Sequence, residues 1–514
     1  MSARPAPAGA TGGGRDFSAR LMTPLLLGSV LNPINTTMIS TGLVAIGRDF
    51  GVGPAGTSWL VAVLYLACAV AQPAAGRIAD LFGPRRAFLC GLVLVVAAGL
   101  VGALAPGFGW LLASRLLLGV GTSTAYPSAL AMLRARSRQV GRPAPRSVLG
   151  LLSLAGMSSA AVGPVLGGVL TATTGWRGIF AVNVPLALLG LVLAVVWLPR
   201  DQPRSARQAD GAGSGVRELD PLGMLLFFLT LVPGMFFLLD LAHPAWYLLP
   251  VVVVVGAVFT RWQLRRPRPF LDLRSLGSNR ALTTTYLRHG LSYLVIYCVM
   301  YGFTQWLEEG HGLSSFHTGL TMLPMSVTAA VCSLLGARTR GIRAPLTTAA
   351  VLLAGGSALL AVTGSGAPWV VLLLAGALFG VPQGLVSTGN QAAVYSQSPP
   401  EGTGSAAGLQ RSAQYLGAIT AASLIALFYG QRADDAGLHE LALVTGVLSL
   451  VLIVLTVTDR ALRRPRSGQA PPPAPASKSP AGTVPRPADP AEPTAAPSAT
   501  GCRTPAPREP GTRA

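Results

Sequence analysis

The sequence predicts an all-α protein that crosses a membrane with fourteen helices, and three observations lead to this fold class. Of the 514 residues, 51% are hydrophobic and 11% are charged, which is about half the charged fraction of a soluble protein. The apolar residues gather in runs of about 20, the length at which an α-helix crosses about 30 Å of hydrocarbon. Arginines fall in alternate loops between these runs, which is the positive-inside pattern.

The first six runs, separated by short polar loops, predict an N-terminal bundle over residues 19–199. The spans are expected at 21–43, 57–76, 87–105, 109–132, 148–171 and 177–198. Arginines follow the second, fourth and sixth spans, with Arg85 and Arg86 after the second, whereas the loop APGFG between the third and fourth spans holds none. The arginine-bearing loops are therefore expected in the cytoplasm.

A polar linker, 200–217, leads to two further spans and then to a second bundle of six. The two inserted spans, 219–241 and 246–264, form a segment predicted over 218–268, and the C-terminal bundle is predicted over 269–460. Its spans are expected at 281–305, 316–337, 345–363, 368–390, 405–429 and 438–458. Because the number of spans is even, both termini are expected on the cytoplasmic side of the inner cell membrane.

Both ends of the chain have the composition of disordered segments. Residues 461–514 are rich in Pro, Ala, Ser and Gly and hold almost no large apolar residue, so they cannot bury enough surface to fold. Residues 1–18 are similar. We therefore expect a disordered cytoplasmic N-terminus and a disordered cytoplasmic tail.

The composition also argues against several function classes. The net charge of +20 does not indicate a nucleic-acid partner, because the arginines lie in alternate loops rather than on one soluble face. The five cysteines lack metal-ligand spacing, so no metal or cofactor is expected. We find no His-Glu-x-x-His run or Gly-x-Ser-x-Gly elbow in a span, and no Gly-x-x-x-x-Gly-Lys-Ser/Thr loop. We therefore expect neither an enzyme nor an ATP-driven pump.

The segment GRIADLFGPRR after the second span combines a carboxylate, arginines and glycines, which are residue types that can form a gate. Asp80 is a carboxylate at the cytoplasmic membrane boundary, near Arg85 and Arg86 in sequence, so it can favour a helix N-terminus or pair with an arginine. Such a contact can form in one conformation and break in another, and Gly76 and Gly83 allow tight turns. The alternative is an ordinary solvated basic loop.

This segment resembles the signature loop of the major facilitator superfamily, and three further stretches agree. ASRLLLGVGTSTAYP in the fourth span is similar to the superfamily's membrane-embedded arginine motif, with Arg115 and two glycines at the expected spacing. GLLSLAGMSSAAVGPVLGG resembles the antiporter motif of the fifth span. GWRGIFAVNVP resembles the opening of the sixth span in fourteen-helix drug:proton antiporters, and the resemblance covers roughly residues 20–460.

The resemblance implies a secondary transporter in which two six-helix bundles rock around a site at the membrane midplane. It implies export of small amphipathic or drug-like compounds in exchange for protons, by a monomer in the lipid bilayer. The glycines and Pro164 of the fifth span would let that helix pack closely and bend at the moving interface, although they also suit a kinked structural helix. The residues assigned to gating are Gly76, Asp80, Gly83, Arg85, Arg86, Gly163, Pro164, Gly167 and Gly168.

Polar residues within the first bundle predict one wall of a cavity for the substrate. Arg115 lies inside the fourth span, where inserting an arginine into the hydrocarbon costs about 2.5–3.5 kcal/mol of free energy. Thr122 and Tyr126 follow on the same helical face. The alternative for Arg115 is that its side chain reaches the outer surface. Asn32 and Asn35 share a face of the first span. In the resembling antiporters, an Asp that takes part in proton coupling commonly stands at the position of Asn35, which cannot ionise.

Polar and aromatic residues of the second bundle predict the facing wall. His289 and Tyr293 belong to a His/Tyr stripe with four-residue spacing in the ninth span, beside Arg288. Aromatic faces of this kind stack a flat substrate or attract a cation, or else pack between helices. The remaining cavity candidates are Gln383, Asn390, Arg411 and Gln414.

The spans hold no deep Asp or Glu, and this opens two alternatives to a proton-coupled drug exporter. If Arg115, Arg288 and Arg411 have no balancing acids, the substrate can be an anionic or zwitterionic metabolite, exported without the usual acid-based coupling. A chain that kept the fold and lost coupling can instead be a non-transporting membrane sensor. If protons are coupled, the candidates are His289, deep in the ninth span, and Glu308 at the outer mouth.

Overall fold

The computed structural model describes residues 18–140, 146–201, 220–239, 244–266, 269, 271, 273–339, 341–398 and 403–463. These residues all belong to one compact unit, Met1–Ser467, and every regular element in them is helical. The predicted disordered ends, 1–18 and 461–514, and the predicted linker 200–217 lie almost wholly outside the described residues. A short helix, η4 (Arg460–Arg463), extends into the start of the predicted tail.

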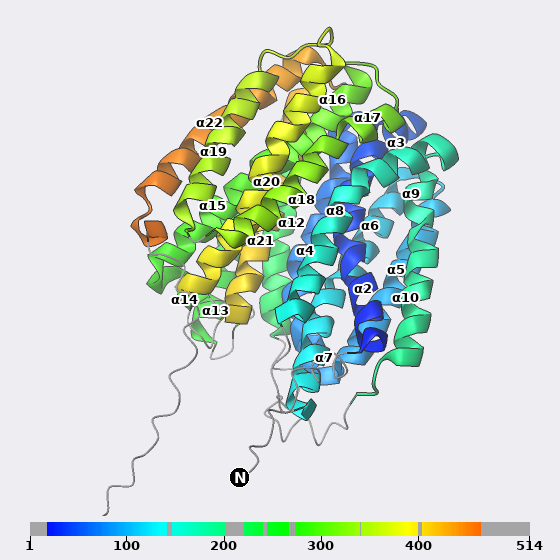
Figure 1. Cartoon of the computed structure of the whole chain (residues 1–514), viewed down its shortest axis with the longest axis vertical. Helices are drawn as coiled ribbons and strands as arrows, with labels where there is room; N and C mark the ends of the chain where they lie inside the picture. Colours follow the sequence, from blue (N-terminus) through cyan, green and yellow to red (C-terminus); the bar gives the residue numbers. More distant parts are fainter. Residues whose placement is uncertain are drawn as a thin grey trace, which may run out of the picture. The chain divides into compact units, whose positions relative to one another are not determined.

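The first half of the chain forms one group of helices, drawn from blue to teal in Figure 1. α2 packs along α8 and α10, α4 packs along α6, and α5 packs along α6 and α10. The elements are α2 (Ala19–Met38), η1 (Ile39–Gly42), α3 (Leu43–Phe50), α4 (Pro54–Phe82), α5 (Pro84–Ala103), α6 (Phe108–Ser123), α7 (Ala125–Val140), α8 (Arg146–Thr174), α9 (Arg177–Ala181) and α10 (Asn183–Trp197).

The second half forms the other group, in which α18 packs along α20, α19 along α22, and α15 along α21. The two halves meet where α4 packs along α21 and where α8 packs on α17 and α18. The elements are α14 (Leu273–Ser278), α15 (Arg280–Tyr297), η3 (Cys298–Phe303), α16 (Thr304–Glu309), α17 (Ser315–Thr321), α18 (Leu323–Arg338), α19 (Arg343–Leu360), α20 (Trp369–Gln397), α21 (Thr403–Tyr429) and α22 (Asp435–Thr458).

The two inserted helices, α12 (Pro221–Leu239) and α13 (Leu248–Arg265), pack on each other, and α12 also contacts α4 and α21. Asp220, which precedes α12 and is buried, joins the pair, because its carboxylate accepts hydrogen bonds from Nε1 of Trp262 at 2.7 Å and Nε2 of Gln263 at 3.1 Å. The inserted pair is therefore anchored at one end and lies against the line where the two halves meet.

The two ends of the bundle differ in charge. Figure 1 places α7, α13 and α14 at one end and α3, α16 and α17 at the other. We call the first the basic end, because these helices carry Arg136, Arg265 and Arg274, and we call the second the opposite end.

Eleven helices of the described residues are long and apolar enough to cross a membrane. Helices α2, α8 and α15 cover the three remaining predicted spans without belonging to that set. α2 and α15 fall outside it because they carry polar side chains, such as Asn32 and Arg288, along faces that point into the bundle. The predicted fold class, an all-α polytopic membrane protein, is thus confirmed, while the number of fourteen spans stays a prediction.

The predicted loop from Gly76 to Arg86 is mostly helical in the structure. α4 continues to Phe82 and α5 begins at Pro84, so Gly83 alone separates them. Gly83 has a φ of 104°, a conformation that a residue without a Cβ adopts readily, and proline is favoured at the first position of a helix. The turn therefore takes a single glycine followed by a proline.

Glycines of α8 bring its backbone against both halves of the bundle. A Cβ on Gly167 would clash with the carbonyl oxygen of Met38 in α2, and one on Gly163 would clash with the side chain of Thr37. A Cβ on Gly168 would lie 2.6 Å from the carbonyl oxygen of Ser315 in α17. Small residues permit such close helix contacts in membranes, so α8 is packed tightly against α2 and α17 at once.

We expect Gly167→Ala to destabilise the protein by about 1–3 kcal/mol, because the added methyl group must displace α8 from α2. The matched control is Gly355→Ala in α19, where a Cβ meets nothing within 4 Å and alanine is the better helix former. Thermal unfolding of the purified protein in detergent measures both. Equal melting temperatures for the two variants would contradict the packing described for α8.

Candidate functional site

A cavity of about 240 Å³ lies between the two halves of the bundle. α2, α4, α6, α7 and α8 line one side, and α15, η3, α18, α20 and α21 line the other. Its polar, aromatic and charged lining residues are Ser29, Asn32, Thr36, Thr37, Tyr65, Gln72, Thr122, Ser123, Tyr126, His289, Tyr293, Tyr297, Ser326, Ser333, Gln383, Ser387, Gln391, Gln410, Arg411, Gln414 and Tyr415.

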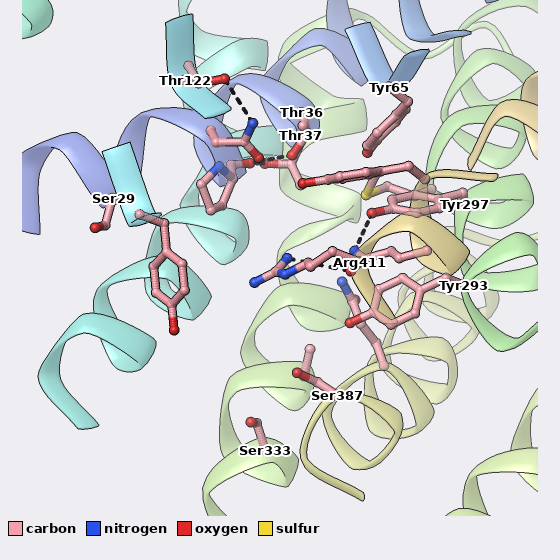
Figure 2. Close-up of a pocket in the computed structure, with 18 of the residues that line it drawn as sticks. Ser29, Thr36, Thr37, Tyr65, Thr122, Tyr293, Tyr297, Ser333, Ser387 and Arg411 are labelled. Carbon is pink, nitrogen blue, oxygen red and sulfur yellow. Dashed lines mark hydrogen bonds between the residues drawn. The ribbon is translucent and has the colours of Figure 1, made fainter. Parts of the chain in front are cut away.

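Asn32 projects from α2 and is oriented by α6, as Figure 2 shows for the hydrogen bond to Thr122. Its Nδ2 donates to Oγ1 of Thr122 at 2.9 Å and lies 3.4 Å from Sγ of Cys68. The Thr122 hydroxyl donates in turn to the carbonyl oxygen of Leu118. Tyr126 lines the same wall from the start of α7. The first half therefore contributes amide and hydroxyl groups in fixed orientations.

The predicted His/Tyr stripe of α15 lines the facing wall. The ring centroids of His289 and Tyr293 are 4.7 Å apart, those of Tyr293 and Tyr297 are 5.6 Å apart, and those of Tyr297 and Tyr301 are 5.8 Å apart. Both interpretations from the sequence, packing and a cavity wall, thus apply to the stripe. Its rings contact one another, and three of them line the cavity. Gln414 of α21 donates to the Tyr297 hydroxyl at 2.8 Å, which holds the stripe in place.

Arg411 extends from α21 into the middle of the cavity, next to Tyr293 and Tyr297 (Figure 2). Its Nη1 lies 3.5 Å from Oε1 of Gln414, at the limit of a hydrogen bond. Arg411 is the residue with a permanent charge among the described lining residues, and none of them is an Asp or Glu. The cavity is therefore electropositive.

Tyrosines join the two halves where the cavity ends toward the opposite end. The Tyr301 hydroxyl donates to the carbonyl oxygen of Thr36 at 2.6 Å and lies 3.0 Å from the Tyr65 hydroxyl. The Tyr415 hydroxyl donates to Oε1 of Gln72, which also links the halves. Tyr301 lies in η3, a π-helical segment, and such segments are frequent at functional sites because they shift side chains out of α-helical register.

Backbone contacts hold the halves together at the opposite end itself. The Ala55 amide donates to the carbonyl oxygen of Gly430 at 3.0 Å. The Thr57 hydroxyl lies 3.4 Å from Oε1 of Gln305, and α8 packs on α17. These contacts cap the cavity, which extends from them toward the basic end.

Glu308 lies in α16 at the opposite end, beyond the predicted ninth span. It is 5% exposed, Oε2 accepts a hydrogen bond from the Ser315 hydroxyl at 3.1 Å, and Oε1 is buried without a described partner. Burial raises the pKa of Glu308 to about 8, against the opposing effects of the Ser315 hydrogen bond and the nearby Arg48 of α3, while Glu309 adds to the rise. Glu308 is thus a buried carboxyl between α16, α17 and α3.

Asn35 and Arg115, both predicted to line the cavity, are instead buried beside it. Nδ2 of Asn35 donates to Oδ1 of Asn183 at 2.5 Å and to the Leu31 carbonyl oxygen at 2.8 Å. Arg115 is 1% exposed, and its Nε and Nη1 donate to the carbonyl oxygens of Leu60 and Asn35 at 3.1 and 3.4 Å. Its Nη2 and Oδ1 of Asn35 have no hydrogen-bond partner among the described residues. Arg115 therefore remains inside the bundle and does not reach the outer surface.

Arg288 and Asn390 also lie behind the cavity wall, in a buried polar network. Nη1 of Arg288 pairs with Oδ2 of Asp459 at 2.9 Å, and its Nε donates to Oδ1 of Asn390 at 3.0 Å. Nη2 donates to the Thr285 hydroxyl at 2.9 Å. No acid partner for Arg288 is evident from the sequence, but Asp459, which directly follows α22, reaches α15. The network ties α15, α20 and the end of α22 together.

The predicted gating residues occupy two separate places. The side chain of Asp80 lies outside the described part of the structure, and a Cβ on Gly76 would contact Pro127 only at 3.9 Å. The backbone amides of Arg85 and Arg86, at the start of α5, donate to the two carboxylate oxygens of Asp201 at 2.9 and 3.0 Å. Asp201 thus stabilises this helix N-terminus. The gating candidates of α8 lie at the contact with α2 and α17, and Pro164 also lines the cavity. They are Gly163, Pro164, Gly167 and Gly168.

Several contributors to this region could not be identified from the sequence, among them Tyr65, Gln72, Asp201 and Asp459. Tyr65 and Gln72 are seven residues apart in an apolar span, and this spacing places them on one helical face. Asp459 directly follows the predicted span 438–458, and Asp201 lies in the predicted linker 200–217, so both were grouped with loop residues. Among the described residues no group of His, Cys, Asp and Glu gathers as it would around a metal ion.

Comparisons with known proteins agree on one family. The model of the Major Facilitator Superfamily matches residues 25–422 and 290–496. An uncharacterized MFS-type transporter of Bacillus subtilis, YwoD, is 31% identical over 455 residues, 87% of this chain and 98% of that protein. The methylenomycin A resistance protein of Streptomyces coelicolor is 25% identical over 82% of this chain and 88% of its own length. The xylose transporter XylE from E. coli, in a partially occluded inward open conformation, superposes with a TM-score of 0.57 at 15% identity, covering 85% of this chain and 96% of that one.

We expect Asp459→Asn to destabilise the protein by about 3–5 kcal/mol, because Arg288 would remain buried without its counter-charge. Glu440→Gln is the matched control, since Glu440 is an exposed acid on α22 and its loss should change stability by less than about 0.5 kcal/mol. Thermal unfolding in detergent compares them. If Asp459→Asn has the same melting temperature as Glu440→Gln, the ion pair does not hold α22 to α15.

Proposed function

Because the chain belongs to the major facilitator superfamily, we propose that it is a secondary transporter that exports small amphipathic or drug-like compounds by proton-coupled alternating access. The observation that carries the proposal is the cavity, which receives hydrogen-bonding and aromatic side chains from both halves and is capped at one end. The likeness to a resistance protein for methylenomycin A supports export of a drug-like compound.

The contacts between the halves support a rocking mechanism. In our proposal the basic end faces the cytoplasm, in line with the positive-inside rule, so the structure represents a state closed to the outside. Opening to the outside would separate Ala55 from Gly430 and Gly168 from Ser315, where the halves touch mainly through backbone. Such contacts can separate without repacking large side chains. In this proposal the protein works as a monomer in the inner membrane, with both termini in the cytoplasm and without enzymatic activity.

Glu308 is the better placed of the two predicted groups for proton coupling. His289 lines the cavity but lies near the cations Arg411 and Arg288. Glu308 lies at the contact that must open to the outside, where its carboxyl is buried in the closed state and would be hydrated in the open one. Protonation from the outer side would therefore let the opposite end close. Asn35, which replaces an acid of the resembling antiporters, cannot carry this proton.

Two alternatives remain distinct from this proposal. Export of an anionic or zwitterionic metabolite without acid-based coupling is favoured by the electropositive cavity. A non-transporting sensor would use the same cavity to bind a ligand and would move none.

Competition uptake into inverted membrane vesicles tests the function. With a chemically varied panel of compounds, we expect vesicles that contain the protein to accumulate a subset of them, and we expect a protonophore to abolish the accumulation. Accumulation that persists without a proton gradient would favour the uncoupled alternative. Ligand binding without flux would favour the sensor and overturn the transporter proposal.

The buried Glu308 predicts that the closed opposite end depends on pH. Because the pKa is raised from 4.5 to about 8 in this state, protonation stabilises closure fully below pH ~4.5, and the stabilisation is lost as pH rises through about 8. Spin labels on Gly107→Cys and Gly366→Cys, which lie in opposite-end loops of the two halves where a side chain meets nothing within 4 Å, should move apart between pH 5 and pH 9. In a Glu308→Gln background the distance should stay short at both pH values. An identical pH response in the two backgrounds would contradict the role of Glu308.

A further inference from the structure

We propose that the compounds taken by this cavity are aromatic monoanions, whose acidic group binds Arg411 and whose ring lies against the tyrosines of α15 and α21. This inference rests on the proposed function, and it adds the charge and shape of the substrate. It depends on three features of the cavity: an accessible cation, the lack of an acid beside it, and a wall of aromatic rings.

The Arg411 guanidinium is available to a ligand. The side chain is exposed to the cavity, and its contact with a described partner is the marginal one, at 3.5 Å, from Nη1 to the neutral Gln414. A guanidinium carries several N–H donors in a planar fork that matches a carboxylate or sulfonate. Arg411 therefore has donors left for an anion in the cavity.

The neighbouring acids are used elsewhere. Asp459 pairs with Arg288 behind the cavity wall, at 2.9 Å, and Glu308 lies at the opposite end against Ser315. The described lining residues include no carboxylate that could neutralise Arg411 or attract a cationic ligand. A bound monoanion would supply the missing negative charge, whereas a bound cation would add a second positive one.

The rings next to Arg411 favour a flat apolar body on that anion. Tyr293 and Tyr297 are neighbours on α15, and Tyr65 lies with its ring centroid 5.2 Å from that of Tyr297 and 5.7 Å from that of Tyr415. Aromatic rings prefer offset or edge contacts with another ring. Met300, Met322 and Met325 also line the cavity, and thioether side chains adapt to rings of different outline.

The test measures binding by calorimetry with purified full-length protein in detergent, using probes that share one carbon skeleton. They are 2-naphthoate, the neutral 2-naphthamide, the cation 2-naphthylmethylammonium, and the saturated decahydro-2-naphthoate. The variants are Arg411→Gln and, as a matched control, Arg261→Gln on the exposed face of α13.

We expect the wild type and the control to bind 2-naphthoate about tenfold or more tightly than 2-naphthamide, which is the size of a hydrogen-bonded charge effect, and to bind the cation most weakly. Decahydro-2-naphthoate should bind about threefold or more weakly than 2-naphthoate. Arg411→Gln should bind 2-naphthoate and 2-naphthamide within about threefold of each other.

Several results would overturn the inference. They are equal binding of anion and amide by the wild type, an anion preference that survives Arg411→Gln, loss of 2-naphthamide binding in Arg411→Gln, and equal binding of the aromatic and saturated anions. Because binding needs no gradient and no flux, the measurement separates this inference from the transport proposal. A wild type that selects the anion but moves nothing in vesicles would leave the inference standing and remove the transporter.

Discussion

Hydrocarbon offers no partner to a polar group, and this constraint arranges the interior of the bundle. The outward faces of α10, α12 and α22 expose large apolar side chains, while polar residues of α2, α15 and α21 face inward. There they either find a partner, as Arg288 does in Asp459, or border the cavity, as Asn32 and Arg411 do. The cavity thus collects the polar groups that the membrane excludes.

The two halves are joined by contacts of two kinds. At Gly168 of α8, backbone approaches the backbone of α17 at Ser315, because small residues let helices pack closely without interlocking side chains. Around Tyr301 the halves are joined by directional hydrogen bonds to Thr36 and Tyr65. The π-helical turn that places Tyr301 lies directly beyond the tyrosines of the cavity wall. A shift of the cavity tyrosines would therefore also displace the groups around Tyr301 that join the halves.

The family, the helical fold and the general course of the cavity-facing helices could be predicted from apolar runs and short motifs, because these depend on local sequence. Pairings between distant residues could not. Nothing near Arg288 in the sequence points to Asp459, 171 residues later, and the amides that Asp201 caps precede it by 115 and 116 residues. Arg115 and Asn35 share polar character with Asn32, but helix rotation turns them behind the wall, and periodicity alone does not fix that rotation. The function of these residues stays a proposal.

The uncompensated guanidinium of Arg411 has a further consequence in an energised cell. In the proposed mechanism, this positive charge would move against an inside-negative voltage when the empty carrier turns outward, and each full elementary charge moved costs about 2.3 kcal/mol per 100 mV. A carrier whose charge is neutralised by its cargo escapes this cost. The electric field would thus favour the inward-facing conformation of the empty transporter. The change to the outward-facing conformation would then occur mainly with substrate bound, and this would suppress unproductive cycles without substrate.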